Sequence, residues 1–107
     1  MLFQQLRNAN AARDAEWNPD NTIGLSFRGN ELAGETGEAC NVLKKLEREA
    51  LGMRGTRATV SQLAEELADV VICVDLIAMH MGIDLATAVR DKFNATSAKN
   101  GFPTRIS

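Results

Sequence analysis

Apolar residues in the middle of the chain recur at the spacing of a helix. If residues 29–51 are helical, one face of that helix carries Leu32, Ala39, Leu43 and Leu46. Fifteen alanines and the absence of tyrosine favour helices elsewhere too. No proline interrupts the span between Pro19 and Pro103. The pattern predicts helices over about residues 2–16, 29–51, 59–81 and 84–99.

Local signals mark the ends of these helices. Residues 17–21 form a turn-rich stretch, residues 22–28 are predicted to be a connection, and glycines interrupt the pattern at 52–55. Thr59 and Gln62 have the spacing of a capping box, Gly82 is a stop signal, and Asp84 is a candidate N-cap. We therefore predict an all-α, four-helix bundle-type fold, with residues 1–107 as a single domain.

Composition excludes several classes of protein. The 107 residues are 45% hydrophobic and 24% charged, with a formal net charge of −2, as in one small globular domain. This charge argues against nucleic-acid binding, and no apolar run is long enough to cross a membrane. Cys40 and Cys73 are interpreted as free thiols in a reducing cytoplasm. So small a core favours a homo-oligomer.

Acidic residues are distributed unevenly. Glu31, Glu35 and Glu38 fall on one helix face, at the edge of the apolar face, and residues 29–43 contain no lysine or arginine. Like charges at this spacing repel each other and weaken a helix. We expect a cation to compensate for that repulsion.

A second acidic pair occurs on the next predicted helix. Glu66 and Asp69 are one turn apart, directly before the apolar run 70–74. Two helices that each offer a pair of carboxylates form a suitable cage for Mg²⁺ or Mn²⁺, which points to phosphoryl chemistry. The alternative is that these acids lie on solvated helix faces.

These residues resemble the MazG-like all-α nucleoside triphosphate pyrophosphohydrolases. The family signature is E-x-x-E on one helix and E-x-x-D on the next, as in Glu35-Thr-Gly-Glu38 and Glu66-Leu-Ala-Asp69. Flanking stretches resemble the family as well, in residues 32–39, 69–74 and 82–94. The segment Glu16-Trp17-Asn18 is similar to the base-pocket segment of the dCTP-hydrolysing members.

The resemblance implies a metal-dependent hydrolase that cleaves between the α- and β-phosphates, releasing a nucleoside monophosphate and pyrophosphate. The implied ligands of Mg²⁺ or Mn²⁺ are Glu35, Glu38, Glu66 and Asp69. One carboxylate, Glu35 or Glu38, is the candidate general base, and Glu31 is a candidate supporting or additional ligand. The enzyme is expected to act on nucleoside triphosphates, with deoxynucleotides favoured over ribonucleotides. The sequence does not distinguish a purine from a pyrimidine base.

Five residues are candidates for binding the substrate. Lys92 and Asn94 match polar positions of the family's last helix, and Lys45 lies near the Glu38 face by helical geometry. Trp17 is a candidate for stacking on the base, and Asn8 for hydrogen bonding to its edge. The alternatives are a solvated lysine for Lys92 and a core plug for Trp17.

The sequence leaves two questions open. Asp75, inside the most apolar run, is expected to pair with an arginine or to support the site. The resemblance implies a homodimer or homotetramer whose neighbouring chains complete the site.

Two further functions stay open: a phosphoribosyl-ATP pyrophosphatase and a non-catalytic oligomeric helical module.

Overall fold

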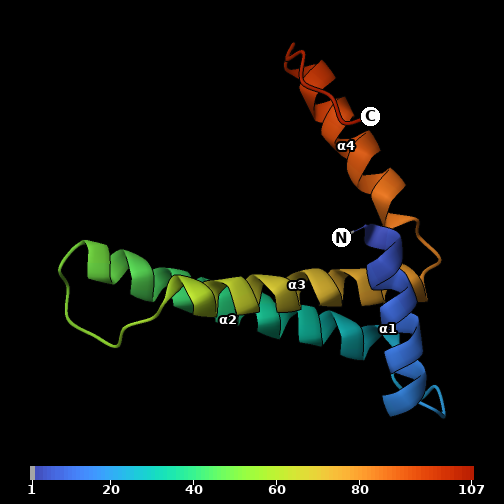
Figure 1. Ribbon diagram of the computed structural model, residues 1–107, viewed down its shortest axis with the longest axis horizontal. Helices are drawn as coiled ribbons and strands as arrows, with labels where there is room; N and C mark the ends of the chain where they lie inside the picture. The colour runs from blue at the N-terminus through green and yellow to red at the C-terminus, as the bar shows by residue number, and fades with distance from the viewer. Residues whose placement is uncertain (1) are drawn as a thin grey trace.

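The computed structural model describes residues 2–107, which form four helices and no strand. The helices are α1 (Phe3–Trp17), α2 (Leu25–Ala50), α3 (Val60–His80) and α4 (Leu85–Lys99) (Figure 1). The predicted all-α class is therefore confirmed, and three of the four helices start and end within one residue or so of their predicted bounds.

The predicted start of α2 was wrong by about one helical turn. The helix begins at Leu25 rather than Gly29, with Gly24 as its N-cap. In the first turn, the buried Arg28 forms an ion pair with Asp14 of α1, with Nη2 3.0 Å from Oδ1. This contact comes from tertiary structure, so the local sequence pattern did not reveal it.

The predicted caps are present. Thr59 Oγ1 accepts a hydrogen bond from the Gln62 N–H at 3.1 Å, and the Thr59 N–H donates to Gln62 Oε1 at 2.8 Å. Asp84 Oδ1 accepts from the Thr87 N–H at 3.3 Å. After α3, Gly82 has a φ of +67°, a left-handed conformation that favours glycine. The chain therefore turns sharply before α4 begins.

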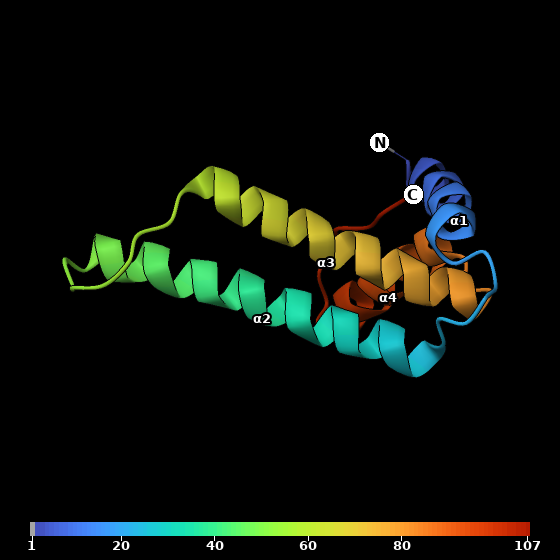
Figure 2. The same ribbon diagram turned by 90° about the horizontal axis from the view of Figure 1, so that it is seen from below.

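Helices α2 and α3 form a long antiparallel hairpin (Figures 1 and 2). The loop over residues 51–59 joins them at one tip. The buried apolar residues are few and mostly small: Ala39, Ala58, Cys73, Leu76 and Ala78. Small side chains let two helices approach closely, so the polar residues at the edge of the contact are brought near each other.

Helix α1 crosses the end of this hairpin where α2 begins and α3 ends (Figure 1). Asp75 of α3 is fully buried, and Arg7 Nε and Asn10 Nδ2 donate hydrogen bonds to it at 3.1 and 2.9 Å. The expected arginine partner of Asp75 is thus found within the same chain. Together with the Arg28–Asp14 pair, these contacts dock α1 on the hairpin.

Helix α4 turns away from α3 at an angle of 107° (Figure 1). The chain has a radius of gyration of 17.1 Å, whereas a compact domain of this length has about 13 Å. A single chain therefore does not close the four helices into a bundle. Apolar side chains on α3 and α4 stay exposed as a result, among them Leu67, Val71, Val89 and Phe93.

Among residues 2–107, no single helix combines the length and the apolar character needed to cross a bilayer. Only α3 and α4 taken together meet that test, and the pair is sharply bent.

Candidate metal centre

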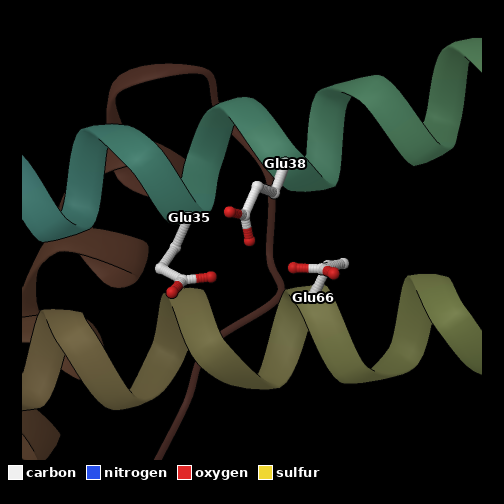
Figure 3. A group of neighbouring side chains, drawn as sticks. All are labelled: Glu35, Glu38 and Glu66. Atoms are coloured by element: carbon white, nitrogen blue, oxygen red, sulfur yellow. The ribbon is translucent and has the colours of Figure 1, made fainter.

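Three of the four predicted metal ligands come together between α2 and α3. Glu35, Glu38 and Glu66 each offer one carboxylate oxygen within 4.8 Å of the other two. Glu35 and Glu38 extend from α2, and Glu66 faces them from α3 (Figure 3). Buried Ala39 and Cys73 belong to the same helix contact, which holds the two backbones close enough for the acids to meet.

Two of these acids have buried oxygens that nothing satisfies. Glu35 Oε2 and Glu66 Oε2 are shielded from solvent and have no hydrogen-bond partner among the described residues. Burial raises the pKa of Glu35, and the negative charge of Glu38 raises it further. Burial is also the largest cause that raises the pKa of Glu66, followed by the negative charge of Glu38. A shielded carboxylate without a partner is unfavourable, and either a proton or a cation relieves that cost.

Asp69 and Glu31 lie around the cluster without joining the group of three. Asp69 is exposed, and its charge contributes to the raised pKa of both Glu35 and Glu66. Glu31 is also exposed; after burial, its charge is the main cause that raises the pKa of the Cys73 thiol. Asp69 therefore acts on the cluster electrostatically, and Glu31 lies near its inner edge.

The donor set fits a hard divalent cation. All the donors are carboxylate oxygens, which Mg²⁺ and Mn²⁺ prefer, and Glu35 and Glu66 each have one buried oxygen without a hydrogen-bond partner. Oxygens that share one octahedral Mg²⁺ lie up to about 4.2 Å apart, since each is about 2.1 Å from the ion. The three oxygens lie within 4.8 Å of one another, so the side chains would have to move closer together to share one ion.

A cavity of about 280 Å³ opens beside the acids. Lys45 lines it together with Glu38 and Glu66, so this predicted substrate-binding residue does lie near the cluster. The sequence analysis missed two further lining residues, Arg57 and Gln62. Neither was among the substrate-binding candidates; Gln62 is the capping partner of Thr59.

The other four predicted substrate-binding residues are not brought to the acids within one chain. Lys92 is exposed on α4, which runs away from the hairpin (Figure 1). Asn94 Nδ2 donates to the Ile106 carbonyl at 2.8 Å, and its Oδ1 accepts from the Ile106 N–H at 2.7 Å, so this amide anchors the C-terminal segment.

Trp17 and Asn8 lie on α1. Trp17 is 58% exposed, which is not the burial of a core plug, and the Arg13 guanidinium lies 4.8 Å from the centre of its ring. Asn8 is exposed, and its Oδ1 accepts a hydrogen bond from Gln4 Nε2 at 2.8 Å. An exposed indole remains free to stack on a planar ligand that reaches it.

A second cavity, of about 410 Å³, lies at the junction of α1, α3 and the start of α4. Its charged lining includes Arg7 and Asp75, which form an ion pair with each other, with Nη2 3.1 Å from Oδ1. Arg7 Nη2 also donates to the Ile83 carbonyl at 2.9 Å. These groups are satisfied by the fold and hold α1 in place.

No protein-family model matches the chain, and no curated protein does. The function proposed below is based on the acids of α2 and α3 and on the cavity beside them.

Proposed function

We propose that this protein is a MazG-like, metal-dependent nucleoside triphosphate pyrophosphohydrolase. It converts a ribo- or deoxyribonucleoside triphosphate into the monophosphate and pyrophosphate. This reaction would control the nucleotide pool or remove unwanted nucleotides from it. The observation that carries the proposal is the pair of buried, unpartnered oxygens Glu35 Oε2 and Glu66 Oε2 within a cluster of three acids. Such a pair is costly without a cation, and the acids occupy the E-x-x-E and E-x-x-D motifs.

The acids hold Mg²⁺ or Mn²⁺ in this proposal. Glu35, Glu38 and Glu66 are the ligands that the chain already brings together, and Asp69 is the fourth. When bound, the ion neutralises phosphate charge and lowers the pKa of water. Its affinity also offsets the repulsion between the acids of α2 and α3.

Hydrolysis proceeds by attack of water on the α-phosphorus. The new bond joins the water oxygen to that phosphorus, and the bond from phosphorus to the bridging oxygen of the β-phosphate breaks. Pyrophosphate leaves with that oxygen, and the proton of the water passes to Glu35 or Glu38.

The working form is a homodimer or homotetramer. One chain leaves apolar faces of α3 and α4 in solvent, and a chain with so small a buried core gains stability when a second copy covers them. Within one chain Lys92 and Trp17 are separated from the acids. In an oligomer, Lys92 or Trp17 of one chain would lie near the acids of another.

A substrate panel tests the function. Each ribo- and deoxyribonucleoside triphosphate is incubated with the purified protein and Mg²⁺ or Mn²⁺, and monophosphate and pyrophosphate are measured directly. Formation of both products in equal amounts, abolished by a chelator, supports the proposal. Folded protein that binds metal and turns over none of these nucleotides would instead favour phosphoribosyl-ATP as substrate, and absence of metal binding would favour a non-catalytic module.

A further inference from the structure

The cavity beside the acids carries unpaired charges of both signs. Its lining includes the acids Glu38, Glu65 and Glu66 and the cations Lys45 and Arg57. The ion pairs among residues 2–107 are Arg7–Asp75, Arg28–Asp14 and Arg90–Asp91. The cations and acids of the cavity thus do not neutralise each other by direct pairing.

Lys45 and Arg57 lie closer than the acids to the loop that joins α2 and α3. Lys45 is seven residues after Glu38 on α2, which is a rise of about 10 Å towards the tip. Arg57 is nine residues before Glu66, at the other side of the same tip. Helices α2 and α3 are antiparallel (Figure 2), and the lining of the cavity includes the two acids Glu38 and Glu66 and the two cations.

Arg57 lies in the loop that joins α2 and α3. The Arg48 guanidinium lies against Gly55, where an added Cβ would be 2.6 Å from Nη1 and where φ is +137°, a value that favours glycine. Ala58 is buried, and Thr59 begins the capping box of α3. Arg57 is therefore followed directly by a buried residue and by the start of α3, which place it near the N-terminal end of that helix.

The volume limits what the cavity can hold. At about 280 Å³, it is at or below the lower end of the pockets that enclose a whole small-molecule ligand, which are about 300–1,000 Å³. A ligand that complements both the acids and the bases of this lining is an anion with a bound metal cation. A metal-bound polyphosphate has that character, since the metal binds the acids and the far phosphate binds Lys45 and Arg57.

We propose that Lys45 and Arg57 bind the terminal pyrophosphoryl part of the substrate, and that the released pyrophosphate occupies the same place. The proposal rests on the function proposed above. It places the nucleoside on the other side of the acids, away from the tip of the hairpin. It also makes a third phosphate a requirement for tight binding, and pyrophosphate a product inhibitor.

Binding of pyrophosphate tests this assignment without turnover. Binding of Mn²⁺ to the wild type is first measured by electron paramagnetic resonance, and binding of radiolabelled pyrophosphate is then measured by equilibrium dialysis with Mn²⁺ present. Arg57→Gln and Lys45→Gln are each expected to weaken pyrophosphate binding about tenfold or more, since each loses one charge-assisted contact. Neither variant should change Mn²⁺ binding or the thermal melt.

Arg54→Gln is the matched control, because Arg54 is exposed on the same loop and does not line the cavity. It should change pyrophosphate binding by less than about twofold. Equal pyrophosphate binding by wild type and Arg57→Gln, or Mn²⁺ binding without pyrophosphate binding, overturns this inference and leaves the proposed function standing. Wild type that binds neither Mn²⁺ nor pyrophosphate overturns both.

Discussion

Glu35 of α2 and Glu66 of α3 face each other across the hairpin, and each has one buried oxygen, Oε2, without a hydrogen-bond partner among the described residues (Figure 3). The negative charge of Glu38 raises the pKa of both carboxyl groups. The metal-free fold therefore keeps three acids together against their mutual repulsion. That repulsion lowers the stability of the metal-free protein, and in the proposed function a bound cation would offset it.

Removing the shared negative charge should stabilise the metal-free protein and destroy the site. Glu38→Gln relieves the repulsion on both Glu35 and Glu66, so the melting temperature in a chelator should rise above that of the wild type. The increase in melting temperature that Mn²⁺ gives the wild type should disappear, and turnover should fall at least about a hundredfold. Differential scanning fluorimetry and the substrate assay measure these effects.

Glu49→Gln is the control for that experiment, because Glu49 is exposed on the same helix and lies outside the cluster. It should leave the response to Mn²⁺ and the turnover unchanged. Full activity in Glu38→Gln would show that the cluster is not the site of hydrolysis.

The raised pKa values of Glu35 and Glu66 predict how the stability of the metal-free protein depends on pH. Each folded-state pKa is above the unfolded value of 4.5, so the folded chain binds protons more strongly than the unfolded chain. The stabilisation from these protons is fully present below the unfolded pKa and is lost as pH rises through the folded values. Thermal melts in a chelator, from about pH 4.5 to about pH 7.5, measure it against Glu35→Gln/Glu66→Gln. The advantage of the double variant should grow with pH; parallel curves would contradict the prediction.

The helices and the acidic pair on each of α2 and α3 were predictable from the sequence because both depend on local spacing, whereas the meeting of Glu66 with Glu35 and Glu38 depends on the packing of α3 against α2. Capping residues such as Thr59 and Asp84 act within one turn, and the pairs 35/38 and 66/69 depend only on the helical period. The helical start at Leu25 was not predictable in this way. The first turn contains Arg28, whose ion-pair partner Asp14 lies on another helix.

Arg57 was missed for a similar reason. As one of several bases after α2, it has no periodic signal of its own, and its place in the cavity follows from the antiparallel register of the hairpin. Residues that face each other across such a hairpin have numbers with a nearly constant sum. By that rule the match of Glu38 with Glu66 implies that Lys45 faces the segment around Arg57. The rule requires that the two helices pair, which the sequence analysis had not established.

Breaking the contact that docks α1 should be costly. Asp75→Ala leaves the Arg7 guanidinium and the Asn10 amide without their shared acceptor in a buried site. We expect a loss of about 3 kcal/mol or more in the free energy of unfolding, measured by urea denaturation. Asp91→Ala removes an exposed ion pair with Arg90 and should change that free energy by no more than about 0.5 kcal/mol. Equal effects of the two substitutions would mean that the buried pair does not stabilise the fold.

The exposed apolar faces predict self-association. The mass in solution, measured by light scattering after size exclusion, should be two or four times the 11.6 kDa of one chain. Leu67→Glu and Val71→Glu place a charge on the outer face of α3, where Leu67 and Val71 are 48% and 43% exposed, and should shift the mass towards one chain. Leu51→Glu, at the tip of the hairpin where Leu51 is 67% exposed, is the control and should not change the mass. A wild type of one-chain mass at high concentration would contradict the prediction.

Mixing two inactive variants tests whether neighbouring chains complete the site. Lys92 lies on α4, away from the acids of its own chain, so any contact with the substrate there requires α4 of a second copy (Figure 1). Lys92→Ala and Glu38→Gln should each have low activity alone. In a dimer formed from equal amounts of both, half of the molecules are mixed, and each of these has one site with an intact Glu38 and an intact Lys92. Co-expression should therefore restore about a quarter of the wild-type activity per site. If Lys92 served the acids of its own chain, no mixed dimer would contain an intact site, and the activity would stay at the level of the single variants.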